Sequence, residues 1–472
     1  MVCSCFIAYP NCPERKEKTM IDELKKGLSL CDDKYADIRY EEDEMTRMSY
    51  RGKELESFYN SVQNGFHLRV LAGGGMCSAS FNNREDLPRI MKETSAAAKI
   101  GRKYRDREID FKLAKPVTDR VLPAPRENPR QVPLEEKLRL LTHYNRLVLK
   151  MPTIQSTILY YYEWVKNKSY LNTENNAVEQ QQVICGISGE IIARDGKSME
   201  NVRASVGGCE DFTMLRNRED VFERKAQIVS DLLRAEKPAS GTYRVLLNQP
   251  MVGLFIHEAF GHFSEADLVK DNPGLLKRLR IGNQLGPDFL NVVDDPAQYG
   301  RPGYYVYDDE GVRGTRTTLI KNGVLTGRLH SMETAADMGE DLTGNGIAVG
   351  WRHTPIVRMS NIFVEPGEMD FESLLDLVGT GLYICDAKGG STMGDEFAFG
   401  AQYGFEVRRG KTGKLLKGIN MSGNLFVTMK KILGIGDDIR FGERGGCGKD
   451  GQTNPQSGSG GPHTVIDDVI IG

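Results

Sequence analysis

The chain has 472 residues, too many for a single hydrophobic core, so we expect two or more domains. Its 62 basic and 65 acidic residues nearly cancel to a net charge of −3, which argues against the basic surface of a direct nucleic-acid binder. No run reaches the roughly eighteen apolar residues that a transmembrane helix needs, so we expect no membrane association.

The N-terminal residues 1–19 mix proline, cysteine and charge, and they lack the basic start and long apolar run of a signal peptide. We interpret 1–19 as a mobile extension and note that Met20 would serve equally well as a start. The 9 cysteines are scattered and show no disulfide-framework spacing, which indicates a reducing compartment. These features predict a cytoplasmic protein.

Residues 20–112 are predicted to form a first domain of helices and strands. The segment 21–31 begins with a helical pattern, and segments 35–45 and 65–82 alternate or run apolar as strands do. The triple glycine in the second strand segment lacks the Lys-Ser/Thr of a phosphate loop, so we interpret it as a turn between strands. A second helix is predicted over 83–104.

Residues 113–235 begin with a proline-rich connector that ends near residue 133. A helix is predicted over 134–150, and a meander of antiparallel strands over 156–196. A long helix over 218–235 closes this part, and the sequence EKPASG that follows is the predicted main domain boundary.

Residues 236–472 are rich in glycine and in short strand patterns. The sequences KNG (321–323) and KTGK (411–414) are predicted hairpin turns, because Asn-Gly and Thr-Gly tolerate positive φ. The whole pattern predicts an α+β fold, with antiparallel sheets and segregated helices: an N-terminal half of helices and strands and a strand-rich C-terminal half.

The sequence HEAFGH carries His257, Glu258 and His262 as H-E-x-x-x-H, one residue longer than the zinc-protease signature H-E-x-x-H. On a regular helix, residues five apart point about 140° away from each other, so both imidazoles could not face one ion. A π-type turn would bring them onto one face, and Gly261 permits the backbone angles of a bulge or break. The motif therefore predicts a local distortion at 259–261.

The alternative is that both histidines are hydrogen-bonded core residues without a metal. A catalytic zinc usually has three protein ligands and an open position, so a third ligand is needed. Candidates are Cys447, which is flanked by glycines, the acidic run Asp308, Asp309 and Glu310, and the remaining histidines. The acidic run is open to three interpretations: a plain turn, recognition of a substrate amine, or support for a metal ligand.

Six motifs in this order resemble the TldD/PmbA family, once called modulators of DNA gyrase: HEAFGH, YYVYDDEGV, TGNG, MSNIFVEPGE, GLYI and CGKDGQ. The resemblance runs from about Ile21 to the C-terminus, and the retained histidine motif places the chain with the metal-bearing TldD branch. It implies a Zn²⁺-dependent metallopeptidase with His257, His262 and Cys447 as ligands and Glu258 as general base.

The same resemblance implies unfolded peptides or a peptide precursor as substrate. It also implies a dimer, either a homodimer or a heterodimer with a PmbA/TldE-type subunit, and makes 236–472 the metallopeptidase domain. The competing hypothesis is a non-catalytic peptide-binding or regulatory module, similar to a gyrase modulator, in which the zinc is structural.

Overall fold

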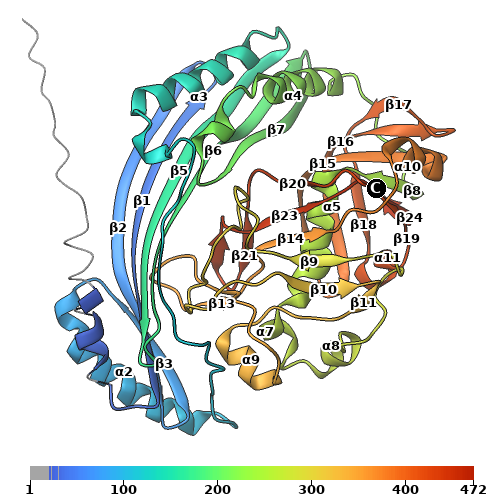
Figure 1. Cartoon of the computed structure of the whole chain (residues 1–472). Helices are drawn as coiled ribbons and strands as arrows, with labels where there is room; N and C mark the ends of the chain where they lie inside the picture. Colours follow the sequence, from blue (N-terminus) through green and yellow to red (C-terminus); the bar gives the residue numbers. More distant parts are fainter. Residues whose placement is uncertain (1–20, 23, 30) are drawn as a thin grey trace, which may run out of the picture.

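The computed structural model describes residues 21–22, 24–29 and 31–472, so the predicted extension 1–19 lies outside the described residues. The fold is mixed α+β with mostly antiparallel sheets, as predicted. Figure 1 shows a long curved sheet from the N-terminal half whose concave side faces a C-terminal half built of shorter strands. Among the described helices, none combines the length and apolarity that crossing a bilayer requires.

The N-terminal sheet has the order β3-β2-β1-β5-β6-β4, with β7 also paired to β6. Its strands are β1 (Tyr35–Arg51), β2 (Glu54–Ala72), β3 (Gly75–Phe81), β4 (Thr118–Val121), β5 (Ile154–Asn172), β6 (Ala177–Asp195) and β7 (Ser198–Cys209). Buried side chains recur at alternate positions for most of β5, as expected for a strand with one face on a core. Because β1 pairs with β5, the segments 20–112 and 113–235 contribute to one sheet, and the boundary between them stays a prediction.

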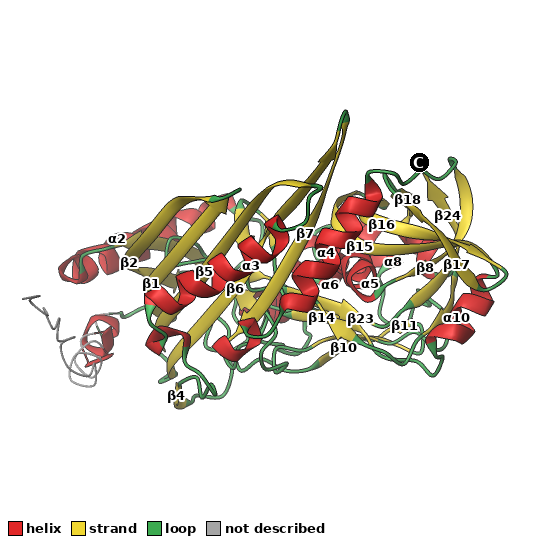
Figure 2. Ribbon diagram, turned by 90° about the horizontal axis from the view of Figure 1, so that it is seen from above, coloured by secondary structure: helices red, strands yellow, loops and turns green. Residues whose placement is uncertain are grey.

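Helices α2 (Leu87–Gly101), α3 (Leu134–Leu149) and α4 (Glu219–Leu232) pack on this sheet. The first contacts β2 and β3, whereas the other two contact each other and the strands β5 to β7. Figure 2 shows α3 and α4 side by side across those strands. Each has an apolar stripe at helical spacing that faces the sheet, which is why these segments fold as surface helices.

Two larger sheets make up most of the C-terminal half. One has the order β15-β8-β24-β18-β16-β17 with β19 paired to β24, and the other has the order β11-β10-β9-β14-β23-β20. The strands of the first are β8 (Gly241–Leu247), β15 (Thr380–Met393), β16 (Glu396–Arg408), β17 (Lys411–Leu416), β18 (Asn420–Asn424), β19 (Ile432–Ile435) and β24 (Thr464–Ile471). Those of the second are β9 (Val292–Asp294), β10 (Thr317–Lys321), β11 (Val324–Leu325), β14 (Asn361–Val364), β20 (Arg440–Phe441) and β23 (Gly458–Gly461).

Short hairpins and helices complete this half. The small paired strands are β12 (Gly346–Ile347), β13 (Ile356–Val357), β21 (Cys447–Lys449) and β22 (Gln452–Asn454). The helices are α5 (Gln249–Ile256), α6 (His262–Ser264), α7 (Ala266–Val269), α8 (Pro273–Arg278), α9 (Met332–Met338), α10 (Phe371–Val378) and α11 (Leu425–Met429). Helix α5 contacts β14 and β23 of one large sheet and β15 of the other, so it lies in the C-terminal core.

Two turn predictions have different outcomes. The KNG hairpin is confirmed: Asn322 and Gly323 have φ of 51° and 74° and join β10 to β11. The KTGK prediction is wrong, because 411–414 already belong to β17. The positive-φ residues are instead Arg409 and Gly410, at 50° and 69°, because the pairing of β16 with β17 places the turn immediately before Lys411.

Candidate metal centre

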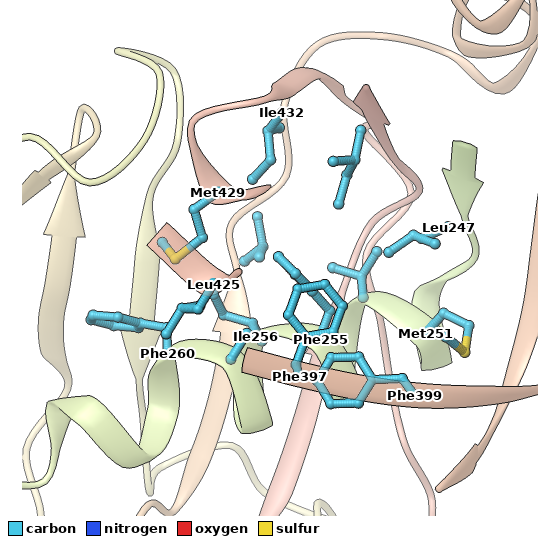
Figure 3. Packing of buried hydrophobic residues seen from close by; sticks show 14 of the residues in the cluster. Leu247, Met251, Phe255, Ile256, Phe260, Phe397, Phe399, Leu425, Met429 and Ile432 are labelled. Atoms are coloured by element: carbon cyan, nitrogen blue, oxygen red, sulfur yellow. The ribbon is translucent and has the colours of Figure 1, made fainter. Parts of the chain in front are cut away.

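Helix α5 is apolar on nearly every face, so it can be surrounded by core rather than lie at a surface. Its start is defined by Asn248, whose side chain accepts a hydrogen bond of 3.2 Å from the backbone N–H of Met251. Figure 3 shows Phe255, Ile256 and Phe260 packed among apolar side chains of the C-terminal sheets. This packing fixes the backbone immediately before and within the histidine motif.

The predicted distortion of the helix is confirmed. Residues His257–Gly261 form a single π-helical turn (η5) between α5 and α6. The extra residue in the turn brings the imidazoles of His257 and His262 together, with ring centroids 5.4 Å apart and planes at 87°.

The predicted reason for Gly261 is wrong. Its φ of −54° and ψ of −47° are ordinary right-handed helical angles that any residue can adopt. What the position lacks is space, because a Cβ there would lie 2.1 Å from the sulfur of Met359 and 3.1 Å from Cδ1 of Ile362. Glycine is therefore favoured by the close approach of Met359, just before β14, and of Ile362 in β14, and not by the backbone conformation.

Cys447 reaches the two histidines from far along the chain. It begins β21, and its carbonyl accepts a hydrogen bond of 2.6 Å from the buried guanidinium of Arg358. Its Sγ lies 3.4 Å from Nε2 of His262. One ligand atom from each of His257, His262 and Cys447 lies within 4.8 Å of the other two. The structure thus brings together the three side chains singled out in the sequence.

The surroundings of Cys447 favour a thiolate. Burial alone would raise the pKa of the thiol, but the neighbouring imidazoles of His257 and His262 lower it to about 6. Burial lowers the pKa of His262, yet its contacts with Cys447 and Glu265 raise that pKa to about 10. Both shifts favour an imidazolium at His262 beside a thiolate at Cys447.

Glu265 is a buried residue of the site that the sequence interpretation missed. Its carboxylate lies 3.0 Å from Nδ1 of His262 and 3.1 Å from Nζ of Lys449. Burial raises the pKa of Glu265, but these two cations keep it below its ordinary value. A carboxylate on one ring nitrogen orients the imidazole and leaves Nε2 directed at the cluster. The spacing of three residues from His262 was the available signal, since such residues are neighbours on a helix.

Glu258 lies at a cleft of about 340 Å³ that is also lined by His257. It is partly exposed, whereas His257 is buried. Its backbone is held by Thr392 of β15, whose hydroxyl donates a hydrogen bond of 2.9 Å to the carbonyl of Glu258. Glu258 therefore shares a solvent-accessible cleft with one residue of the cluster.

The acidic run lies in the packing between the two halves and is not among the residues that line this cleft. Asp308 accepts backbone hydrogen bonds of 2.9 Å from Glu310 and Val312 in its own loop, and one of 2.8 Å from Gly346 of β12. Asp309 lies 2.8 Å from Lys168, and Glu310 lies 2.6 Å from Arg69, both cations of the N-terminal sheet. These carboxylates tie the loop to the concave face of that sheet.

Three of the other described histidines lie close to carboxylates outside the motif. His330 lies 3.0 Å from Glu340, His463 lies 2.6 Å from Asp438, and the exposed His143 lies 2.9 Å from Glu219. These histidines lie outside the cluster of the two motif histidines and the cysteine.

Comparison with known proteins gives three consecutive family matches. Residues 36–100 match PmbA/TldA metallopeptidase domain 1, residues 127–235 match the central domain, and residues 240–472 match the C-terminal domain. A protein of Synechocystis sp. named metalloprotease is 35% identical over 440 residues, which cover 93% of this chain and 94% of that protein.

A Saccharolobus solfataricus protein named zinc metalloprotease TldD homolog is 32% identical over 331 residues, 68% of this chain and 72% of that protein. The crystal structure of TldE from Thermococcus kodakarensis has a TM-score of 0.76 at 16% identity and covers 96% of this chain and 99% of that one, so it shows a shared fold. The chain therefore belongs to the PmbA/TldD family of metallopeptidases.

Proposed function

We propose that this protein is a zinc-dependent peptidase of the TldD type. The observation that carries the proposal is the convergence of two imidazole nitrogens and one thiolate within 4.8 Å of one another, beside a partly exposed glutamate. Its relatives are named metalloproteases, and one of them is named a zinc metalloprotease.

The residues present fit a zinc ion. Two histidines and one cysteine are a three-ligand donor set that leaves a fourth position open. Nε2 of His257 is buried and has no hydrogen-bond partner, a costly arrangement that a bound cation would relieve. A zinc ion held by His257, His262 and Cys447 supplies Lewis acidity for a peptide carbonyl and for water.

Glu258 is the proposed general base. It follows His257 directly in the π turn, lines the cleft and is partly exposed. In this role it takes a proton from water as the scissile carbonyl is attacked and passes that proton to the leaving amine. Glu265 holds His262 in the orientation that aims Nε2 at the cluster.

An extended, unfolded peptide is the proposed substrate. The walls of the cleft are rich in main chain, since Gly389, Gly442, Gly445 and Gly446 line it. Such walls offer backbone groups that can bond an added strand with little demand on side-chain identity.

We also propose a dimer, formed with a second copy or with a PmbA/TldE-type subunit. The similarity in fold to a TldE supports this proposal. So do the exposed apolar side chains of Phe58 and Val62, which lie on the part of β2 that does not pair with β3. A cytoplasmic location fits the described cysteines, which are all free thiols.

The test is to incubate the purified protein with an unfolded polypeptide, with and without a chelator, and to identify fragments by mass spectrometry. We expect fragments that disappear with the chelator. Glu258→Gln should abolish cleavage while the zinc content stays near one per chain, whereas Cys447→Ser should lose both.

The competing hypothesis, a peptide-binding module with a structural zinc, makes the opposite prediction. In that case Glu258→Gln would leave function intact and no fragments would form. Absence of fragments under every metal condition, with a PmbA-type partner supplied, would refute the peptidase assignment.

A further inference from the structure

A second cavity, which we call the aromatic cavity, adjoins the cleft of the candidate metal centre. It has a volume of about 380 Å³ and lies between the N-terminal sheet and the segment that leads to Cys447. Tyr160, Tyr162 and Trp164 of β5 line one side. Arg444, Gly445 and Gly446 line both this cavity and the metal cleft, so one segment of chain forms a wall of each.

The carboxylates of the aromatic cavity are already neutralised. Glu163 is 2.5 Å from the buried ammonium of Lys137, and Glu443 is 2.6 Å from the guanidinium of Arg218. Neither therefore attracts a further cation into the cavity.

Two cations of the aromatic cavity have no such partner. Within the described residues, no carboxylate forms an ion pair with Arg47 or Arg444. Both guanidiniums approach the ring of Tyr160, at 4.4 and 5.9 Å from its centroid. A guanidinium next to an aromatic face keeps its N–H donors available, and two N–H groups of one fork match the two oxygens of a carboxylate.

The metal cleft has the same sign of charge. Arg203 and Lys388 line it together with Arg444, whereas Glu258 is its single lining carboxylate among the described residues. Arg203 is only loosely paired, at 3.9 Å from the half-buried Glu190. A concave surface with this excess of cations concentrates anionic groups of a substrate.

We propose that the aromatic cavity is a substrate subsite that binds a carboxylate of the peptide through Arg47 and Arg444. This rests on the proposed peptidase function. Arg444 precedes Cys447 by three residues, and three residues of extended chain span at most about 11 Å. The bound carboxylate therefore lies within a few residues of the bond that is cleaved. It is either an Asp or Glu side chain or the C-terminal carboxylate of the peptide.

The experiment compares matched peptides. A cleavage site is first mapped in an unfolded polypeptide, and peptides are then made with Glu or Gln at each neighbouring position and with a free or amidated C-terminus. In one of these peptide pairs, we expect the wild-type protein to cleave the peptide with the carboxylate with a kcat/KM about tenfold or more above that of its uncharged partner. A charge-assisted hydrogen bond would give a preference of this size. The Glu and Gln arms report a side-chain carboxylate, and the free and amidated arms report the C-terminus.

The combined variant Arg47→Gln and Arg444→Gln should remove this preference, so that both members of each peptide pair are cleaved with similar kcat/KM. Arg352→Gln is the matched control, since this exposed arginine also stacks on an aromatic ring, 4.0 Å from the centroid of Trp351, but lines neither cavity. It should keep the full preference. Equal rates for all wild-type pairs, or a preference that survives the double substitution, would overturn the proposal.

A binding measurement separates this proposal from the peptidase assignment. Fluorescently labelled Glu and Gln peptides, or free and amidated ones, are titrated into the Glu258→Gln protein and followed by anisotropy. Tighter binding of the carboxylate form, lost in the Arg47 and Arg444 variant, supports the subsite even if no peptide is cleaved. If the carboxylate and uncharged peptides bind equally well, or if the arginine substitutions do not change the difference between them, the subsite is refuted even if the protein cleaves peptides.

Discussion

Replacement of Gly261 by alanine tests why the π turn contains a glycine. Its backbone angles are already helical, and alanine is favoured over glycine in a helix by about 1 kcal/mol. The added methyl, however, would lie 2.1 Å from Sδ of Met359 and 3.2 Å from its Cε. Met359 is only 1% exposed, so its side chain has little room to move away.

Overpacking of this kind costs about 1 to 3 kcal/mol, so the net loss of stability in Gly261→Ala should be up to about 2 kcal/mol. Because the displaced turn contains His257 and leads directly into His262, the zinc content should fall as well. Urea denaturation and metal analysis of the same preparations would measure both effects.

Gly101→Ala is the matched control. Gly101 also has helical angles, φ −57° and ψ −31°, but a Cβ there would meet no atom within 4 Å. This substitution should leave the protein as stable as the wild type or more stable. If Gly261→Ala behaved like Gly101→Ala and kept its zinc, steric contact with Met359 would not be the reason for the glycine.

Three further predictions concern pH, metal affinity and buried charge. Burial and nearby arginines lower the pKa of His67 to about 2, so the unfolded chain takes up a proton below pH 6.5 that the folded chain does not. Between pH 7.5 and 5.5, the free energy of unfolding of the wild type should therefore fall by about 1.4 kcal/mol more than that of His67→Gln, as measured by urea denaturation. The same pH dependence in both proteins would contradict this. Glu265→Gln removes the carboxylate on His262 and should weaken zinc binding about 10- to 100-fold in chelator competition; an unchanged affinity would show that the contact does not orient the ligand. Lys168→Met leaves Asp309 buried without its 2.8 Å partner and should cost about 3 to 5 kcal/mol, whereas a loss below about 1 kcal/mol would mean that water or another cation replaces it.

Much of the fold and part of the candidate site could be predicted because their causes are local. Alternating and helical patterns along the chain predict strands such as β5 and helices such as α3, since burial of one face imposes a period of 2 or 3.6 residues. The helical period also makes a spacing of five between His257 and His262 incompatible with a shared ligand unless the helix is distorted. That distortion could be inferred without knowledge of the remaining chain.

What only the tertiary structure decided depends on packing between distant segments. Cys447 lies 185 residues from His262 along the chain. Residue spacing alone therefore left several candidates for the third metal ligand. The reason for Gly261 lies in the close approach of Met359 and Ile362, and Asp309 and Glu310 are explained by cations of the N-terminal half. Arg444 likewise becomes part of a cavity only when its loop meets β5. Steric contact and charge pairing act through space, so a linear pattern of residue types does not contain them.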